Sequence, residues 1–399
     1  MLQSHRSDKL QSACFLISKQ TAQASREMRQ SNRSKNPASA PRKKAESFIT
    51  GEPGSHAAGI QPDPGKKKSF ADNKSLHVET RSDAFKDVTD AEIGNTALIR
   101  CRNLERVAGF RRFYLKFEGQ NPTGTQKDRI AFAQVQDALR KNFETVTLAT
   151  CGNYGAAMAF ACSMAGLRCI IHIPETYHTA RTREMTDLGA ELVRVSGDYE
   201  KSVEISRAFA AERDCYDANP GDMNTALQLR AYQEIAFEIH DALQNAPGYV
   251  AVPVSNGTTL AGIYQGFLSL YRKGKTSRIP KMVAGSSYGK NPVISAFQKK
   301  LARCADLGPD QIRETPVNEP LINWHSLDGN QALDSIRRSC GWGGYASDQS
   351  MLRFARLMRD KEGLNVLPAS TAGLIAFLDL HTKRRLPSGC CVIVITGRK

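Results

Sequence analysis

The sequence has no long apolar segment, and uninterrupted apolar runs such as CCVIVI, residues 390–395, are short. A membrane-spanning helix needs about 20 such residues, so the sequence excludes one. The ten cysteines form no C-x-x-C pair, and the eight histidines form no H-E-x-x-H pair. We therefore expect no metal site. Most cysteines have apolar neighbours, which favours buried thiols in a reducing compartment over a disulfide framework.

Acidic residues are outnumbered, because 55 Lys and Arg stand against 40 Asp and Glu and leave a net charge of +15. Such an excess suggests a nucleic-acid partner only where basic residues gather on one surface, with aromatic residues among them. Residues 1–86 contain 16 of the basic and 8 of the acidic residues, and the remaining excess is spread along residues 87–399 without a basic stripe. This distribution argues against a nucleic-acid partner.

Residues 1–86 are rich in Ser, Gln, Asn, Gly and Pro, which is typical of a disordered, low-complexity extension. Their apolar patch at residues 13–17 is too short for the core of a signal peptide. A transit peptide, a nucleic-acid arm, a secretion signal, a dispensable tail and a misplaced start codon all stay open for this segment. We expect a cytoplasmic protein, unless the extension directs it to an organelle or out of the cell.

From about residue 87 onward, short apolar runs alternate with amphipathic stretches, which predict strands and helices respectively. Continuous apolar strands separated by helices are typical of a parallel sheet covered on both faces. More than six such units favour two sheets, so the fold class is α/β. Strands are expected at residues 145–149, 169–173, 192–195, 249–254, 281–284 and 390–395, and helices at residues 131–140, 155–164, 179–188, 200–213 and 228–243.

A lysine stands at the start of a predicted helix in the segment KFEGQNPTGTQKDR, residues 116–129, after a turn that Asn121 and Pro122 favour. The positive end of the helix dipole disfavours a charged ammonium at Lys127. Attack on an aldehyde requires a neutral amine, so Lys127 is a candidate Schiff-base lysine. A Lys-Asp-Arg triplet at a helix start is more often solvated surface, so this segment alone does not decide.

Two predicted strand-to-helix loops have the composition of anion sites. Residues 149–155, ATCGNYG, combine backbone N–H groups with the side chains of Thr150 and Asn153 and would fit a substrate carboxylate, although a plain turn is the simpler explanation. Residues 252–262, VPVSNGTTLAG, precede a helix expected at residues 263–271 and would let backbone amides converge on a phosphate. They match neither a P-loop nor G-x-G-x-x-G, so they indicate a phosphate and not a nucleotide.

The last predicted strand ends at Thr396, where ligands of open α/β sheets bind, so its hydroxyl could hydrogen-bond a ring nitrogen. In this order, the four segments resemble the fold-type II pyridoxal-phosphate enzymes of the tryptophan synthase β-like group. The resemblance covers about residues 87–399, includes IGNTAL at residues 93–98, and is greatest to threonine synthases. Gln126, Cys151, Ser255 and Thr258-Thr259 depart from the threonine synthase pattern, and these departures bear on the substrate rather than on the cofactor.

The resemblance implies a pyridoxal 5′-phosphate (PLP) cofactor and a role for each motif. Lys127 would bind the cofactor covalently and move protons at the substrate Cα. Asn153 would hydrogen-bond the 3′ oxygen of the cofactor, and Thr396 would face its pyridine nitrogen. The 5′-phosphate would be held by Ser255, Asn256, Gly257, Thr258 and Thr259. The substrate carboxylate would be held by Thr150, Cys151, Gly152 and Tyr154.

The resemblance also implies a homodimer, and it implies that each chain has two open parallel-sheet αβα domains. The large PLP-binding domain would comprise residues 87–118 and 236–399, and the small mobile domain would comprise residues 119–235. The implied reaction is elimination or replacement on an amino acid with an activated side chain, as in the conversion of O-phosphohomoserine to threonine and phosphate. The alternative is a β-replacing synthase of the cysteine synthase or 2,3-diaminopropionate synthase type, which uses O-phosphoserine or O-acetylserine. A non-catalytic PLP-fold protein is a further alternative, against which the intact Lys127 argues. Arg181 and Arg183 could meet an anionic leaving group, although surface charges explain them more simply.

Overall fold

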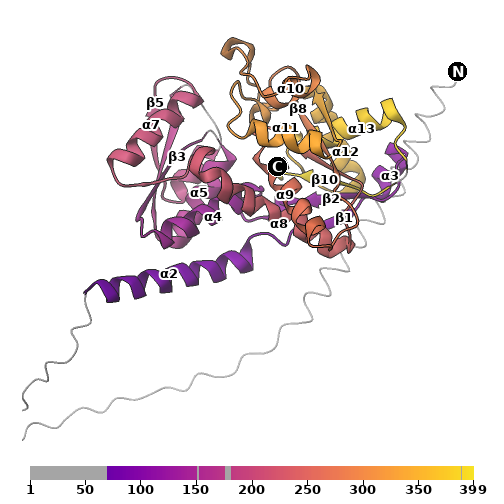
Figure 1. The fold of residues 1–399 in the computed structure, drawn as a ribbon. Coiled ribbons are helices and arrows are strands. Elements are labelled where there is room, and N and C mark those ends of the chain that lie inside the picture. The colour runs from indigo at the N-terminus through magenta and orange to yellow at the C-terminus, as the bar shows by residue number, and fades with distance from the viewer. Residues whose placement is uncertain (1–69, 151, 176–180, 388) are drawn as a thin grey trace, which may run out of the picture. The chain divides into compact units, whose positions relative to one another are not determined.

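The structure is a computed structural model that describes residues 70–399 except 151, 176–180 and 388, with side chains from residue 80 onward. Within these residues the strands form two separate sheets, as the sequence predicts (Figure 1). The larger sheet has the order β1-β2-β10-β7-β8-β9, and the smaller sheet has the order β5-β4-β3-β6. Every neighbouring pair is parallel except β1 and β2, which pair antiparallel at one edge of the larger sheet.

The larger sheet is buried on both faces because alternate residues of its central strands point in opposite directions. Val250 and Val394 pack toward α9, α10 and α11, whereas Ala251 and Ile393 pack toward α12 and α13. The bounds of these elements are β1 Leu98–Arg100, β2 Phe113–Phe117, β7 Tyr249–Pro253, β8 Lys281–Ser287, β9 Trp342–Ala346, β10 Cys391–Ile395, α3 Arg102–Ala108, α9 Thr258–Arg272, α10 Pro292–Gln298, α11 Gly329–Arg338, α12 Asp348–Glu362 and α13 Ala372–Arg384.

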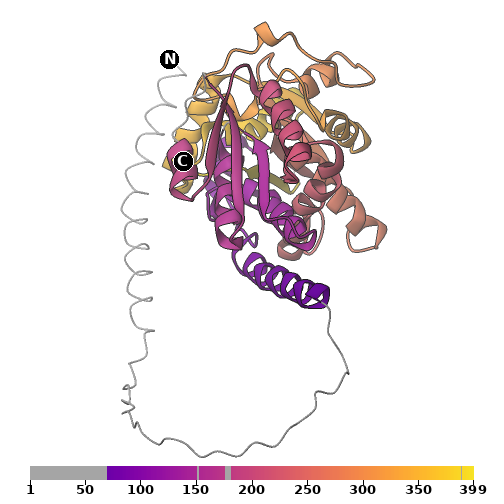
Figure 2. The ribbon, with the colours of Figure 1, turned by 90° about the vertical axis from the view of Figure 1, so that its left-hand side faces the viewer.

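The smaller sheet is also layered between helices, because its right-handed crossovers place α5 and α6 on one face and α7 on the other (Figure 2). Helix α8 then returns the chain toward the larger sheet and packs along α9. The bounds are β3 Thr145–Ala149, β4 Arg168–Pro174, β5 Glu191–Val195, β6 Tyr216–Asp217, α4 Lys127–Arg140, α5 Asn153–Ala165, α6 Arg181–Asp187, α7 Tyr199–Glu212 and α8 Thr225–Leu243.

The smaller sheet falls inside the domain expected at residues 119–235, and the mobility of that domain stays a prediction. One boundary differs from expectation. Residues 70–86, which we expected in the low-complexity extension, belong to helix α2, Phe70–Glu92. Its Phe85 is buried and stacks on Phe132 of α4 with ring centroids 5.2 Å apart, and Gln136 of α4 donates to the Ser82 carbonyl at 2.9 Å, so both apolar and polar contacts hold this helix. The remainder of the expected extension lies outside the described residues.

Two absences concern the described residues alone. Their helices include none that is both long and apolar enough to cross a membrane. The same residues contain no group of three or more His, Cys, Asp and Glu side chains that could hold a metal ion.

Candidate active site

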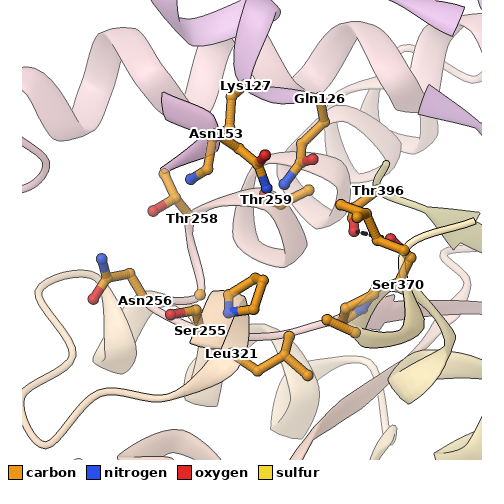
Figure 3. A pocket seen from close by; sticks show the side chains of 15 residues that line it. Gln126, Lys127, Asn153, Ser255, Asn256, Thr258, Thr259, Leu321, Ser370 and Thr396 are labelled. Atoms are coloured by element: carbon orange, nitrogen blue, oxygen red, sulfur yellow. Dashed lines mark hydrogen bonds between the residues drawn. The ribbon is translucent and has the colours of Figure 1, made fainter. Parts of the chain in front are cut away.

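The predicted site residues gather beyond the carboxyl ends of four strands. The chain leaves β2 at Phe117, β3 at Ala149, β7 at Pro253 and β10 at Ile395, and each exit leads into one of the motifs. These ends meet at a cavity, which we call the first cavity, on the side of the sheets where α/β proteins bind ligands. Its lining includes all eight residues predicted to bind the cofactor, namely Lys127, Asn153, Ser255, Asn256, Gly257, Thr258, Thr259 and Thr396 (Figure 3).

Lys127 is the first residue of α4, as predicted, and its side chain lines the first cavity. In the described part of the chain, no hydrogen bond or ion pair engages its Nζ, which lies 5.6 Å from the centre of the Tyr154 ring. Burial lowers the pKa of Lys127 to about 8, although the carboxylates of Asp328 and Glu319 oppose this shift. The amine is therefore partly neutral near physiological pH, which a nucleophile toward an aldehyde requires.

Backbone contacts hold the start of α4 against the end of β10. Gln126 N donates to Thr396 O at 3.0 Å, and Thr125 bridges to Gly397. Gly124 allows the preceding turn because its φ is +86°. These contacts place Lys127 and Thr396, 269 positions apart in the sequence, on the wall of one cavity.

A buried group of charged side chains lies next to this segment. It consists of Lys116, Glu118, Arg129 and Glu238, and we call it the Arg129 cluster. The Arg129 guanidinium donates to both carboxylates, at 2.7 and 2.9 Å to Glu118 and at 2.7 and 2.9 Å to Glu238. The Lys116 ammonium donates to Glu238 and to the Thr96 carbonyl. Neighbouring carboxylates raise the pKa of Arg129 despite its burial. The cluster therefore joins β2 and α8 to the first turn of α4.

The phosphate loop is shorter than the sequence suggests. Helix α9 begins at Thr258 and not at residue 263, so Thr258 and Thr259 form its first turn. Gly257 precedes it with φ +96°, and a Cβ there would lie 2.5 Å from the Ala332 Cβ, so only glycine fits. The α9 N-terminus thus presents free backbone N–H groups and its positive dipole to the first cavity, which is the arrangement that binds a phosphate.

The side chains of this loop differ in the hydrogen bonds that they make within the protein. Asn256 Oδ1 accepts hydrogen bonds from Asn323 Nδ2 at 3.0 Å and from Leu327 N at 3.3 Å. The Thr258 hydroxyl donates to Asp328 Oδ2 at 2.6 Å. Within the described residues, the structure gives the Ser255 hydroxyl no hydrogen-bond partner, and it lines the first cavity.

Thr396 has a partner that the sequence analysis missed. Its hydroxyl lies 3.0 Å from the hydroxyl of Ser370, which lines the same cavity on the side opposite Thr258 and Asn256 (Figure 3). Ser370 belongs to a short 3₁₀ helix, Pro368–Thr371, which no periodic pattern in the sequence predicts. Gln126 also lines the cavity, although the sequence marked it only as a departure from the threonine synthase pattern.

A second cavity adjoins the first, and Lys127 and Asn153 line both. Thr150, Gly152 and Tyr154 line this second cavity, whereas Cys151, the fourth residue predicted for the substrate carboxylate, lies outside the described residues. The buried Tyr154 hydroxyl has two possible acceptors, Gln134 Oε1 and the Ala218 carbonyl, for its one proton, so only the ring and backbone of Tyr154 remain for a ligand. A Cβ at Gly155 would lie 2.7 Å from Thr150 Cγ2 and 2.6 Å from Met185 Cε, so a larger residue there would displace both side chains.

The second cavity has an acidic lining, to which Asp198, Glu200, Glu314 and Glu319 contribute. Burial raises the pKa of both Glu200 and Glu314. Lys127 is the one Lys or Arg among the described residues that line it. Arg181 instead donates to Glu184 at 2.6 Å and to the Thr123 carbonyl, and Arg183 lines a separate surface depression.

The donor set of the first cavity fits PLP. Lys127 offers an amine without a competing partner for the aldehyde, and the α9 N-terminus offers N–H groups for the phosphate. The hydroxyl pair of Thr396 and Ser370 offers a neutral partner for the ring nitrogen. The Asn153 amide, half-buried and with no hydrogen bond among the described residues, is left for the ring oxygen.

Comparisons with known proteins give the same indication as the residues of the first cavity. The chain is 32% identical over 283 residues to a threonine synthase of Methanocaldococcus jannaschii, which spans 70% of this chain and 68% of the relative. It is 27% identical over 347 residues to a threonine synthase of Mycobacterium bovis, with 85% and 89% covered. Among solved structures, a threonine deaminase of T.th. matches with a TM-score of 0.64 at 21% identity, covering 80% of this chain and 97% of the other. Maize serine racemase matches with a TM-score of 0.66 at 15% identity, covering 80% and 94%.

These structural matches show the fold alone, which is the fold-type II architecture that the sequence indicates. A family model described as "Pyridoxal-phosphate dependent enzyme" matches residues 89–397, which include every predicted site residue. The chain therefore belongs to the pyridoxal-phosphate-dependent enzyme family, and pyridoxal 5′-phosphate is its cofactor.

Proposed function

We propose that this enzyme carries out elimination or replacement on an α-amino acid whose side chain bears a leaving group, in the manner of a threonine synthase. The observation that carries this proposal is the position of Lys127, whose amine lines both the cofactor cavity and the adjoining second cavity. An amine in that place can serve the cofactor and the substrate in turn. Bound PLP supplies an electron sink for the charge that develops at the substrate Cα.

Side chains and backbone groups of the chain move the proton, orient the substrate and contact the cofactor ring. Lys127 takes the proton from the substrate Cα, and its lowered pKa of about 8 suits a general base near neutral pH. The loop of Thr150 and Gly152 orients the substrate carboxylate beside the start of α5. The Thr396 hydroxyl is a neutral partner, so it does not impose a positive charge on the ring nitrogen. That arrangement favours expulsion of a leaving group over a long-lived carbanion.

The conversion of O-phosphohomoserine to threonine and phosphate is the specific reaction we propose. Its support is the two relatives named threonine synthase, the better of which is 32% identical and covers 70% of this chain. The order of the site segments along the chain gives the same indication.

One observation favours a second candidate, a β-replacing synthase of the cysteine synthase or 2,3-diaminopropionate synthase type. The described lining of the second cavity is acidic, with Lys127 as its single Lys or Arg, so it offers little to a phosphate leaving group. An uncharged ester such as O-acetylserine would be repelled less than O-phosphohomoserine or O-phosphoserine.

A substrate comparison with the PLP-loaded enzyme tests these proposals. Phosphate release and threonine formation from O-phosphohomoserine would support the first candidate. No turnover of O-phosphohomoserine, together with turnover of O-acetylserine or O-phosphoserine when sulfide or an amine is supplied, would favour the second. Keto-acid formation from serine or threonine as the sole reaction would contradict both. The Lys127→Ala variant serves as the inactive control in every arm.

A further inference from the structure

A buried carboxylate lies just behind the phosphate loop, and no motif of the sequence points to it. Asp328 is fully buried and precedes α11, outside the lining of the first cavity. Its Oδ2 accepts the Thr258 hydroxyl at 2.6 Å, and its Oδ1 accepts the Thr225 hydroxyl at 2.8 Å. The shorter distance is that of a strong hydrogen bond to a carboxylate oxygen, and the longer one is that of an ordinary O–H···O hydrogen bond.

Three helices begin at this carboxylate. Thr225 is the first residue of α8, Thr258 is the first residue of α9, and Asp328 itself stands immediately before α11. The positive ends of the three helix dipoles stabilise one negative charge there, which explains how a carboxylate is tolerated in the interior. The α9 terminus is also the place proposed for the cofactor phosphate, so two anions would share it.

The hydrogen bond to Asp328 decides what Thr258 can offer to a phosphate. A hydroxyl group has one proton, and the proton of Thr258 is donated to Asp328. Toward the first cavity the Thr258 oxygen can present only lone pairs, which a phosphate does not bind. In Figure 3 this oxygen lies on the side of the cavity away from Thr396. Thr259, the next residue, also lines the cavity, and its hydroxyl interacts with the phenol of Tyr232, which can act as the donor and leave the Thr259 proton for a phosphate.

Asp328 also acts on the other end of the site. It is the strongest of the charges that favour the protonated form of Lys127, with Glu319 second. The ring of Tyr154 also faces the amine, with its centre 5.6 Å from Nζ. One buried charge therefore influences both the phosphate loop and the amine.

We propose that Asp328 is a positioning residue of the cofactor site: it turns the Thr258 hydroxyl away from the cofactor, so that the phosphate is bound by the backbone of the first turn of α9 and by the Thr259 hydroxyl. This inference rests on the proposed placement of the phosphate at the α9 N-terminus. It predicts that two adjacent threonines with the same side chain contribute differently to phosphate binding.

The test compares binding of PLP and of pyridoxal, which lacks the phosphate, to the full-length chain freed of cofactor. Equilibrium dialysis gives the ratio of the two dissociation constants for Thr258→Val, Thr259→Val, Asp328→Asn and the double variant Thr258→Val/Asp328→Asn. Thr259→Val should reduce the preference for PLP about tenfold to a hundredfold, because it removes a hydrogen bond to a charged group. Thr258→Val should weaken both ligands together and leave the ratio within about twofold of that of the unmodified chain.

Asp328→Asn removes a negative charge near the phosphate and should increase the preference for PLP, about severalfold. The double variant should match Asp328→Asn alone, since the two side chains share one interaction. A loss of PLP preference in Thr258→Val equal to that in Thr259→Val would overturn the inference. If the ratio stays constant in every variant, the phosphate lies elsewhere and the placement itself fails. Thr258→Ser, which keeps the hydroxyl, should behave as the unmodified chain and separates hydroxyl loss from misfolding.

Discussion

Two cationic side chains on the first turn of α4, Arg129 and Lys127, differ in their charged surroundings. Arg129 donates four hydrogen bonds to Glu118 and Glu238, whereas Lys127, two positions earlier, has no acidic partner in contact among the residues that the structure describes. Neighbouring carboxylates raise the pKa of Arg129, and burial lowers the pKa of Lys127 to about 8. Arg129 is a permanent charge, because a guanidinium keeps its proton and two carboxylates stabilise it, whereas Lys127 can lose its proton and react as an amine.

The difference assigns separate tasks to the two side chains. Removal of one partner from a buried ion pair leaves an uncompensated charge and destabilises the fold. Removal of an unpaired amine leaves no such charge behind. We therefore expect activity to depend on Lys127 and stability to depend on Arg129.

The largest expected effect is that of Lys127→Ala on turnover. Loss of the general base lowers kcat by at least about 10²–10⁴-fold, and the absorption band of covalently held cofactor disappears. The free energy of unfolding of the cofactor-free protein should change by less than about 1 kcal/mol, because no ion pair is broken. Steady-state kinetics, absorption spectra and urea unfolding measure the three quantities.

Lys141→Ala is the matched control on the same helix. Lys141 follows the last turn of α4, is largely exposed, and pairs with Asp137 at 2.7 Å. Such surface pairs contribute little, so kcat and the cofactor band should be unchanged. Full activity in Lys127→Ala would refute the role given to Lys127.

Arg129→Met should show the reverse pattern, with a loss of about 3–5 kcal/mol in the free energy of unfolding, because Glu118 and Glu238 lose their common partner. Urea unfolding of the cofactor-free protein measures this loss. Glu118 is fully buried, so it cannot be rehydrated without opening the fold. Arg129→Lys keeps the charge but loses the paired geometry, and it should recover only part of the loss. Equal destabilisation by Lys127→Ala and Arg129→Met would remove the distinction between the two cations.

The sequence predicted one of these two cations and missed the other for a physical reason. Lys127 stands in a recognisable turn before a helix, which a reading of neighbouring residues can find. The partners of Arg129 come from the 3₁₀ turn after β2 and from α8, so the cluster is created by tertiary packing. Ser370 and Asp328 were missed for the same reason, since their contacts with Thr396 and Thr258 join distant segments.

The fold shows a similar division. The strand β3 was predicted to the residue, because five consecutive residues with a largely apolar, β-branched composition announce it. The strand β2 was missed because Lys116 interrupts its apolar run, and the structure buries that lysine against Glu238. The strand β9 was missed because of its glycines: a Cβ at Gly343 would lie 3.0 Å from Phe297, so close packing excludes the side chains that signal a strand.

The Arg129 cluster can also be weakened by acid. Burial would raise the pKa of Glu238, but Arg129 and Lys116 lower it from 4.5 to about 2. Because the folded value lies below the unfolded one, this stabilisation is present above about pH 4.5 and is lost as the pH falls toward 2. A shift of that size corresponds to about 3 kcal/mol.

The comparison of the unmodified chain with Glu238→Gln across this range measures that contribution. The gap in the free energy of unfolding should be widest near pH 6 and should close as the pH approaches 2. A gap that stays constant with pH would mean that Glu238 contributes through packing and not through charge.

A smaller change is expected in the acid–base behaviour of Lys127. With a pKa of about 8, the amine of the cofactor-free protein should react with pyridoxal at a rate that rises with pH and reaches half its maximum near pH 8. Asp328→Asn removes the first of the two carboxylates that hold the proton, so the midpoint should move to lower pH. Stopped-flow absorbance measures the rate. A midpoint above 10 would show that the amine is solvated like an ordinary lysine.

The smallest expected effect concerns the neutral pair at the ring nitrogen. Ser370→Ala removes one hydrogen bond to Thr396, and a bond between uncharged groups contributes about 0.5–1.5 kcal/mol, so PLP affinity should fall by no more than about tenfold. Thr396→Asp, which replaces the neutral hydroxyl with a carboxylate, should instead favour a protonated ring nitrogen and change the absorption spectrum of the bound cofactor. Equal spectra in the two variants would mean that Thr396 does not face the ring. Uncharged partners of the cofactor therefore adjust its affinity, whereas the amine of Lys127 decides whether the cofactor is held covalently.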